Sequence, residues 1–419
     1  MRILVLTPYY APDLGASASL YATLCEELAR LGHHVSVLCA VPHYPTGRVP
    51  AEFRGRLFQR ETRNGVEVTR VRIPSLDRTK VGFRLLGFLC FQFLASWIIW
   101  RRKTDLLVAS NPAFEIALPL AVRGFLRRTP FVYSVHEIYP DIGVKLGVFR
   151  NRGVIHLLRS MERLCCKSAA YIRVISEVYR TALTAAGIPT SKIVVIGDWT
   201  DTDYVHPLPR RNEFSARWGL DDCFVVLYAG NIGPTQGLEN LMEAARLLAH
   251  EPKIRFVIVG DGSARDVLRH SAERACLENV VFLPFQPREI LPRVLATADV
   301  SVLSLKKGFA TDSVPSKLLN ILASGRPVMA VVDPGSDISK IVREAHCGAT
   351  VEPENPTALA ATLLQLSRNE PLRKLWGENA RAYVLKYGSK SVAAEKFQEL
   401  ASAASFLSGN RAKQRLSEV

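Results

Sequence analysis

Short apolar, β-rich runs alternate with helical stretches along the 419 residues, and this alternation constrains the fold more than any other feature. It occurs twice, once before a polar stretch that begins at Gly197 and once after it. Strands that alternate with helices predict parallel sheets with helices on both faces. The predicted class is therefore α/β, with two doubly wound, Rossmann-like domains that face a central cleft. The expected strands lie within residues 2–7, 34–40, 66–73, 105–110, 130–135 and 170–176, and then within 223–230, 254–262, 280–285, 299–305 and 327–332.

The same pattern gives a division into domains. Residues 1–195 hold the first series of strands and helices, and 210–385 hold the second. Between them, 196–209 is polar and contains two prolines, so we interpret it as a linker. Residues 386–405 are expected to form a helix that packs back on the first domain. The polar tail, 406–419, is expected to fray.

One segment of the first domain, near 83–103, is unusually apolar. From Leu85 to Trp100 the chain reads LLGFLCFQFLASWIIW, with arginine before it and RRK after it. A membrane-spanning helix needs roughly 20 apolar residues, so a full crossing is disfavoured. A helix lying in the membrane interface fits the tryptophans and the basic flank. A buried core helix fits the hydrophobicity equally well, and both interpretations stay open.

The net charge is +15, from 54 basic and 39 acidic residues. Such a charge implies an anionic partner, which could be nucleic acid, a phosphate-bearing ligand or an anionic membrane surface. Basic pairs such as Arg127-Arg128 and Arg210-Arg211 are not interleaved with aromatic residues. This pattern argues against nucleic acid as the partner.

Glycine-rich loops follow two expected strands of the second domain, at the sheet edge where ligands bind in this architecture. The first is GNIGPTQG, Gly230 to Gly237, and the second is GDGSARD, 260–266. Glycines allow close approach of a ligand, and the start of the following helix offers free N–H groups. Neither loop has the GxGxxG or Walker A spacing. A plain turn and a plain helix cap are the structural alternatives.

The segment SVPSKLLNILASGRP, 313–327, gives a stronger signal. It predicts a helix that opens at Pro315 and carries Lys317 in its first turn. A lysine is unfavourable at this end of a helix unless an anion is bound, and the amides of the first turn would bind a phosphate together with it. The alternative is a lysine whose ammonium group reaches into solvent.

In the first domain, His136 and Glu137 directly follow the expected strand at 130–135. An imidazole beside a carboxylate at a strand end could orient a sugar or manage a proton, and a structural histidine is the alternative. The loop PYYAPDLGAS places Gly15 at the start of a helix, and PHYPTGR contains His43. The DTD sequence at 201–203 looks like a metal-binding motif but lies in the expected linker, where a turn is favoured.

With these residues in view, the chain resembles the family 4 retaining glycosyltransferases, which have the GT-B fold. It looks most like the branch that builds lipopolysaccharide O-antigen and colanic-acid-type exopolysaccharide. The resemblance runs over nearly the whole chain, and its markers are specific together. They are PYYAPDLGASA, VPHYPTGRV, FVYSVHEIYPD, GDWTDTDYVHP, YAGNIGPTQGLENLMEAA, VIVGDGS and VPSKLLNILASGRPV.

The resemblance implies a role for residues in both domains. The catalytic group would be His136, Glu137, Asp312 and Lys317. The donor would be bound by Gly230, Asn231, Ile232, Gly233, Gln236, Gly260, Asp261, Gly262, Phe285, Ser313, Val314, Ser316, Leu318 and Asn320. The acceptor loops would use Gly15, Ala16, His43 and Tyr44.

Several of these positions depart from the common family pattern. The two glutamates of that pattern fall on Asp312 and Asn320, and its phosphate-binding arginine and lysine fall on Asn231 and Gln236. Lys317 could supply the missing positive charge. No metal and no cofactor are expected, because the helix start and the lysine would stabilise the leaving diphosphate.

The implied activity is sugar transfer, with retention, from a nucleotide-diphosphate sugar to a glycan on a polyprenyl pyrophosphate. The expected location is cytoplasmic, peripherally associated with the cytoplasmic face of the inner membrane, where anionic lipid is also a partner; nucleic acid is not. One alternative is a sugar-nucleotide 2-epimerase of the same fold, which would act on a soluble substrate. Another is a degenerate transferase that binds nucleotide sugar as a scaffold.

Overall fold

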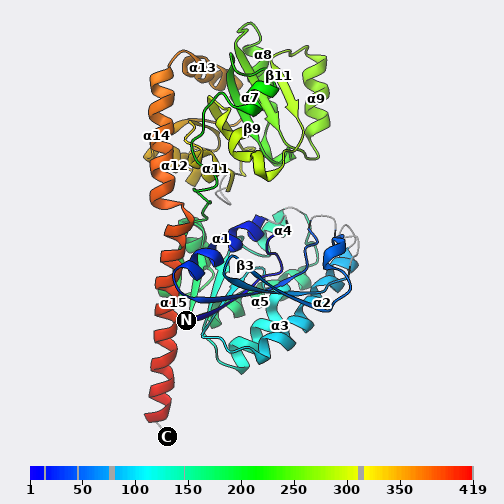
Figure 1. Ribbon diagram of the computed structural model, residues 1–419, viewed down its shortest axis with the longest axis vertical. Helices are drawn as coiled ribbons and strands as arrows, with labels where there is room; N and C mark the ends of the chain where they lie inside the picture. The colour runs from blue at the N-terminus through cyan, green and yellow to red at the C-terminus, as the bar shows by residue number, and fades with distance from the viewer. Residues whose placement is uncertain (14–15, 45–46, 75–80, 146, 310–315, 418–419) are drawn as a thin grey trace. The chain divides into compact units, whose positions relative to one another are not determined.

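The chain is divided into two compact units in its computed structural model, and each is described by itself (Figure 1). The first unit comprises Met1–Gly197 and Ala393–Val419, and the second comprises Asp198–Val392. The structure describes residues 1–13, 16–44, 47–74, 81–145, 147–309 and 316–417.

The first unit is built on a sheet of eight strands in the order β3-β4-β2-β1-β5-β6-β7-β8. All neighbouring pairs are parallel except β3 and β4. The strands are β1 (Arg2–Leu6), β2 (His34–Ala40), β3 (Phe58–Arg63), β4 (Val66–Val71), β5 (Leu106–Ser110), β6 (Phe131–Val135), β7 (Tyr171–Val174) and β8 (Ile193–Val195). The helices are α1 (Ala16–Arg30), α2 (Val81–Arg101), α3 (Ala113–Leu120), α4 (Asp141–Lys145), α5 (Arg152–Ser168) and α6 (Glu177–Ala185).

The second unit is built on a fully parallel sheet of six strands, in the order β11-β10-β9-β12-β13-β14. The strands are β9 (Phe224–Ala229), β10 (Ile254–Val259), β11 (Val280–Leu283), β12 (Val300–Ser304), β13 (Val328–Val331) and β14 (Gly348–Val351). The helices are α7 (Glu213–Arg217), α8 (Glu239–Leu247), α9 (Arg265–Arg274), α10 (Leu291–Ala296), α11 (Ser316–Ala323), α12 (Asp337–Glu344), α13 (Pro356–Ser367) and α14 (Glu370–Tyr387).

Both faces of the second sheet are buried under helices. Along β9, Val225 and Leu227 pack into one apolar cluster with α11, α12 and α14, whereas Val226 and Tyr228 pack into another with α8, α9 and α13. This alternation follows from the period of two along a strand. The continuous apolar runs of the sequence are therefore strands buried on both sides, as predicted.

Helix α2 has one side buried in the core and one exposed apolar side, so it is a core helix in part, and its position in a membrane interface stays a prediction. Phe91, Ala95 and Ile99 are buried in the core of the first unit. The opposite side is exposed and also apolar; we call it the α2 ridge, and it consists of Leu86, Leu89, Phe93, Trp97 and Trp100. Figure 1 shows α2, α3 and α5 on the same face of the first unit's sheet.

The stretch that was predicted as a linker, 196–209, is instead largely packed against the second unit. Val205 is part of its apolar cluster, and Trp199 is also buried. Arg381 donates to the carbonyl oxygens of Thr202 and Val205, at 3.0 and 3.1 Å. Arg326 donates to the carbonyl oxygen of Leu208 at 2.9 Å. Bonds to main-chain carbonyls, which the sequence does not reveal, hold this stretch in place.

The end of the chain also differs from the prediction of a helix at 386–405 followed by a frayed tail at 406–419. Helix α14 ends at Tyr387, and α15 then runs from Lys390 to Ser417. From Ala393 onward α15 belongs to the first unit. The tail contains alanine, leucine, lysine, arginine and glutamine, which favour the helical state.

Candidate functional site

Two glycine-rich loops in the second unit lie against each other, directly after β9 and β10. The amide of Gly230 donates to the carbonyl oxygen of Val259 at 2.9 Å, and Ile232 donates to Asp261 at 2.8 Å. Gly260, with φ of 147°, has no room for a side chain, because a Cβ there would lie 1.9 Å from the carbonyl oxygen of Gly230. The two predicted loops therefore form one floor of main chain.

The Lys317 side chain crosses this floor. Lys317 is in the first turn of α11, and a Cβ added to Gly230 would lie 2.7 Å from its Cε and 3.0 Å from its Nζ. Glycine at position 230 thus makes room for the lysine. Among the described residues no carboxylate forms an ion pair with it. Burial lowers the pKa of the Lys317 ammonium to about 7, because desolvation disfavours the charged form.

Two polar side chains hold the ammonium group in place. Its Nζ lies 3.9 Å from the centroid of the Tyr228 ring, a cation–π contact, and 3.4 Å from Oε1 of Gln236. The Tyr228 hydroxyl lies 2.6 Å from the carbonyl oxygen of Asn231 and 3.0 Å from the same Oε1. Desolvation raises the pKa of Tyr228, so its hydroxyl stays protonated and can donate. Tyr228 was not predicted as a site residue.

The start of α11 adds main-chain donors beside this lysine. The first amides of a helix have no partner within the helix, and those of Ser316, Lys317 and Leu318 are in this position. Ser316 is exposed, whereas the Leu318 side chain is buried, so only its amide can face a ligand. The predicted residues Asp312, Ser313 and Val314 lie outside the described residues.

The side-chain oxygen of Asn320 already has a hydrogen-bond partner within the protein. Its Oδ1 accepts a hydrogen bond from Oγ1 of Thr200 at 2.6 Å. Phe285 follows β11, and 70% of it is exposed; its contact with the donor stays a prediction. The main chain joins this loop to the floor, because the amide of Gly260 donates to Leu283 at 3.2 Å.

The other predicted donor residues lie in or beside the floor. Asp261 is exposed and accepts a bond at 2.8 Å from the amide of Gly262. Ile232 is fully buried, so its contribution is main chain. The side chain of Asn231 packs beside both Gly233 and Gly262, since a Cβ at either would come within 2.8 Å of it. Together these residues form a narrow main-chain surface beside Lys317.

In the first unit, His136 directly follows β6, and both nitrogens of its ring have hydrogen-bond partners. Arg173 donates to Nδ1 at 3.1 Å, which makes Nδ1 an acceptor and assigns the proton to Nε2. Nε2 lies 3.0 Å from the hydroxyl of Tyr21 on α1. Asn111 accepts from the His136 amide at 2.9 Å and donates to the carbonyl oxygen of Glu137 at 2.6 Å. This histidine is held in one orientation.

The neighbouring residue Glu137 is exposed and joins that network through its carbonyl oxygen. Desolvation raises the pKa of its carboxyl, and a hydrogen bond with Tyr139 opposes that shift. Arg173, by contrast, is fully buried and donates through Nε to the carbonyl oxygen of Ile196 at 2.6 Å. The sequence showed Arg173 only as a polar interruption of a β-rich run.

The predicted acceptor loops are joined by an aspartate that the prediction missed. Asp13 accepts hydrogen bonds from the amides of His43 and Tyr44, at 3.2 and 3.1 Å. Tyr9 stacks on the His43 ring with centroids 5.4 Å apart. Of the other two predicted acceptor residues, Gly15 lies outside the described residues, and Ala16 is the first residue of α1. The loops after β1 and β2 thus meet at the carboxyl edge of the first sheet.

The DTD sequence forms a turn, as expected. Oδ1 of Asp201 accepts from the amides of Asp203 and Tyr204, at 3.1 and 3.2 Å. Both aspartates also form ion pairs with Lys390, at 2.8 and 2.9 Å. Within the described part of the chain, no cluster of three His, Cys, Asp or Glu residues could hold a metal ion.

Comparison with known families gives matches over both units. The family described as "Glycosyl transferase 4-like domain" matches residues 15–199, and the family described as "Glycosyl transferases group 1" matches 210–383. One relative, from Escherichia coli K12, is the "Putative colanic acid biosynthesis glycosyl transferase WcaI". It is 28% identical over 375 residues, which are 87% of this chain and 92% of the relative.

Two further comparisons agree. The "Probable glycosyltransferase WbjE" of Pseudomonas aeruginosa is 28% identical over 71% of this chain and 74% of its own. Among solved structures, HepE of Anabaena in complex with UDP is similar with a TM-score of 0.71 and 20% identity, over 96% of this chain and all of that one. The two predominantly parallel sheets and these matches show that the chain belongs to the family 4 glycosyltransferases with the GT-B fold.

Proposed function

We propose that this chain moves a sugar, with retention, from a nucleotide-diphosphate donor to a polyprenyl-pyrophosphate-linked glycan at the cytoplasmic face of an anionic membrane. The family makes it a glycosyltransferase, and the name of WcaI supports a role in polysaccharide biosynthesis. HepE has been solved with UDP and with UDP-glucose, which supports a nucleotide sugar as the donor.

The observation that carries the donor proposal is the Lys317 ammonium held over Gly230. A buried lysine without a described carboxylate partner is costly, and a bound anion would offset that cost. The amides of Ser316, Lys317 and Leu318, in the first turn of α11, add the favourable end of a helix dipole. We therefore assign the donor diphosphate to the space between the floor and the start of α11.

The proposed chemistry needs no nucleophile from the protein. The bond between the anomeric carbon and the diphosphate oxygen breaks, and the acceptor hydroxyl forms the new bond from the same face. A departing diphosphate oxygen takes the acceptor proton. Lys317 and the α11 amides stabilise the charge that develops on the diphosphate, so we propose that no metal or cofactor is required. His136, fixed by Arg173 and Tyr21, would orient the transferred sugar.

The α2 ridge supports a membrane-bound acceptor over a soluble one. Its five large apolar residues follow spacings of 3, 4, 4 and 3, which is one face of a helix. Arg101 stacks on Trp97 and Arg127 stacks on Trp100, each at 3.9 Å, so cations accompany the aromatic rings. Within the described residues, no helix combines the length and the hydrophobicity needed to cross a bilayer. We propose that the ridge lies in the interface of an anionic membrane.

The donor proposal is tested by transfer of radiolabelled sugar. Purified protein, membranes that contain polyprenyl-pyrophosphate-linked glycan and a panel of UDP-, GDP- and dTDP-sugars should give labelled lipid with one donor class. Lys317→Met should reduce that transfer at least a hundredfold. Lys340→Met, which changes an exposed lysine of α12, is the matched control and should retain activity. Near-normal transfer by Lys317→Met would refute the site.

Two readouts separate the remaining alternatives. The anomeric configuration of the product, measured by NMR, should match that of the donor. Release of an epimerised free sugar nucleotide without lipid would instead identify a 2-epimerase. Neither transfer nor hydrolysis of any donor would identify a binding scaffold.

Flotation with vesicles tests the membrane proposal. The protein should float with vesicles that contain anionic lipid, and Phe93→Ser should reduce the bound fraction, because 66% of Phe93 is exposed on the ridge. Leu375→Ser is the matched control, since Leu375 is an exposed apolar residue of α14. Equal flotation of both variants and the unaltered protein would contradict the role of the ridge.

A further inference from the structure

A pocket lies at the amino edge of the first unit's sheet, beyond the last turn of α2. It measures about 280 Å³ and lies between the first residues of β1, β2 and β4, the edge strand β3, and the residues that follow α2. We call it the amino-edge pocket, and six of its lining residues are Ser36, Arg60, Glu67, Arg102, Lys103 and Thr104. The predicted acceptor loops follow β1 and β2 at the opposite edge of this sheet, so the amino-edge pocket is separate from the candidate site.

The position of the pocket follows from the alternation of side chains along the strands. Val71 of β4 packs in one apolar cluster with Ile99 of α2. Thr69 and Glu67 precede Val71 by two and four residues, so they point to the same side of the sheet. Arg60 of β3 is paired with Thr69, and it points to that side too. The lining continues directly after the last residue of α2, so the pocket is the part of this face that lies beyond the helix.

Cations outnumber carboxylates in and around this pocket. The basic residues that line it are Arg2, Arg60, Arg102 and Lys103. Among the described residues there, Glu67 has its Oε1 at 3.3 Å from Nε2 of His34, and Asp105 forms an ion pair with Arg2 at 2.6 Å. Four positive charges against these two negative ones leave a net charge of +2 when His34 is neutral.

Three of these cations have no acidic partner within the described part of the chain, namely Arg60, Arg102 and Lys103. Arg102 donates to Oγ1 of Thr69 at 2.6 Å, which holds its guanidinium group against the sheet. Burial lowers the pKa of Arg102; the charge of Glu67 raises it, and the charge of Arg60 lowers it further. Because an arginine stays charged at neutral pH, its charge is held here at a cost in free energy, and a bound anion would offset that cost.

The end of the helix explains only part of this cluster. Cations after the last turn of a helix are favourable without a ligand, because the carboxyl end of a helix carries a partial negative charge. This accounts for Arg102 and Lys103. It does not account for Arg60, which comes from β3 and adds a like charge beside Arg102. A phosphate, with several acceptor oxygens, would bridge cations that come from separate elements.

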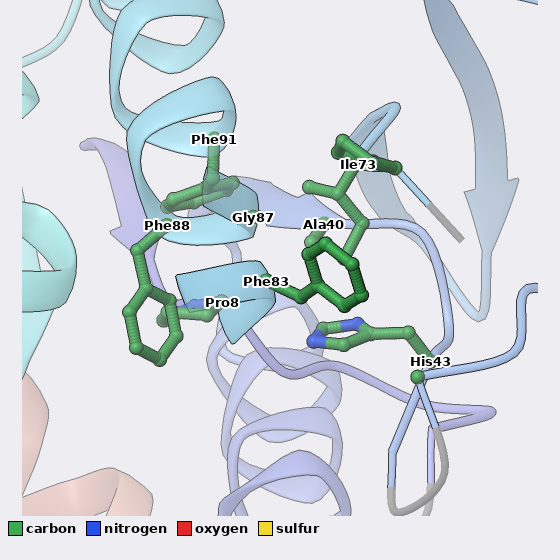
Figure 2. Close-up of a pocket in the computed structure, with 10 residues that line it drawn as sticks. Pro8, Ala40, His43, Ile73, Phe83, Gly87, Phe88 and Phe91 are labelled. Atoms are coloured by element: carbon green, nitrogen blue, oxygen red, sulfur yellow. The ribbon is translucent and has the colours of Figure 1, made fainter. Parts of the chain in front are cut away.

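The pocket also adjoins the α2 ridge. The ridge ends at Trp100, two residues before Arg102, and Arg127 stacks on the Trp100 ring at 3.9 Å. A lipid whose acyl chains lie along the ridge would therefore bring its headgroup to this end of the helix. The pocket at the other end of α2, shown in Figure 2, is lined in part by Phe91 and His43, and it encloses only about 20 Å³, enough for a single water molecule.

From this geometry we infer that the amino-edge pocket binds the phosphate of an anionic phospholipid headgroup, whose acyl chains lie along the α2 ridge. The inference rests on the membrane association in the proposed function and adds a specific headgroup site to it. A ridge alone binds any apolar surface, whereas this pocket selects lipids with an accessible phosphate. Bound at the end of the ridge, the headgroup also fixes the direction in which the first unit faces on the membrane.

Flotation with vesicles of phosphatidylcholine and phosphatidylglycerol tests this inference. Arg60→Gln should lower the partition coefficient more than about tenfold, because a hydrogen bond between charged groups is lost. Arg128→Gln is the matched control, since Arg128 is exposed and follows the Arg127 that stacks on the ridge, outside the pocket. It should lower the coefficient about fivefold or less, the effect of one surface charge. Both arginines are exposed, so neither variant should lower the melting temperature.

Calorimetry without membranes separates a lipid from a soluble phosphate. The unaltered protein should bind dihexanoyl phosphatidylglycerol, below its micelle concentration, at least tenfold more tightly than inorganic phosphate, because its short chains contact the end of the ridge. Arg60→Gln should lose this binding and Arg128→Gln should retain it. Equally tight binding of inorganic phosphate would overturn the lipid occupant and assign the pocket to a soluble phosphate compound.

The outcomes for the pocket, the ridge and the transferase are distinguishable. Equal partition of Arg60→Gln and Arg128→Gln, with that of Phe93→Ser still reduced, would overturn the pocket and leave the α2 ridge in place. Failure of the unaltered protein to float would contradict both the ridge and the headgroup site. Neither result changes the test of the donor site, which is the loss of sugar transfer in Lys317→Met.

Discussion

The affinity for the leaving nucleoside diphosphate should fall as pH rises, because Lys317 must be protonated to bind it. Burial lowers the pKa of Lys317 from 10.5 to about 7. This difference corresponds to about 5 kcal/mol of unfavourable desolvation, at 1.36 kcal/mol for each factor of ten. A bound diphosphate restores the charged form, so the pKa of the complex lies well above that of the free protein.

The sign and size of the effect follow from this linkage. Above pH 7 the free protein carries a neutral lysine and must take up a proton when it binds, which costs about 1.4 kcal/mol per pH unit. The dissociation constant should therefore rise about tenfold between pH 7.5 and 8.5. Close to one proton should be taken up per ligand at pH 8.5.

Calorimetry in buffers with different ionisation enthalpies measures both quantities. The ligand is whichever of UDP, GDP and dTDP raises the melting temperature most. Lys317→Arg keeps its charge at every pH in this range, so its binding should be independent of pH. Lys317→Met should bind weakly and without proton uptake. A flat pH profile for the unaltered protein would refute the reasoning, because it would mean that the lysine is charged before the ligand arrives.

Three further predictions concern other parts of the two sites. Gln236→Lys should partly restore transfer to Lys317→Met, since Oε1 of Gln236 lies 3.4 Å from the lost ammonium, and no rescue would show that the charge must come from α11. Gly260→Ala should lower the free energy of unfolding by about 3 kcal/mol or more in urea titrations, because its Cβ would clash with main chain. Gly32→Ala, at φ of 88° with open space around it, should cost only about 1 kcal/mol, and equal losses would show that the clash is relieved. Asp13→Ala should raise KM for the lipid acceptor more than it lowers kcat, as it frees two amides of the acceptor loop, and an unchanged KM would remove that loop from acceptor binding.

The fold could be predicted because its signals are local. The eleven predicted strands, most of them continuous apolar runs, appear where the sequence placed them. Three further strands were not predicted: β3, β8 and β14. Strand β8 has three residues and β14 has four, and Phe58–Arg63 of β3 is polar, largely exposed and antiparallel. The Asn64-Gly65 pair, with φ of 47° and 80°, is a hairpin signal that could have found β3.

The site could be predicted only in part, for a related reason. The position of Lys317 in a first turn marked it as an anion-binding lysine, but its contacts with Tyr228 and Gln236 join residues more than 80 positions apart. The same holds for Arg173, which reaches His136 across 37 positions. Such pairs meet through the order of strands in a sheet, which a single sequence does not specify.

The interlocked glycines after β9 and β10 have a consequence for how such an enzyme can diverge. At Gly260 and Gly262 the facing carbonyls leave no space for even one methyl group, so the main-chain surface of the proposed site has a fixed shape and offers no lysine or arginine of its own. A positive charge over this floor must then come from a side chain of a neighbouring segment, as Lys317 of α11 does. During evolution the positively charged residue could therefore move from a loop to a helix without a change in the main-chain floor.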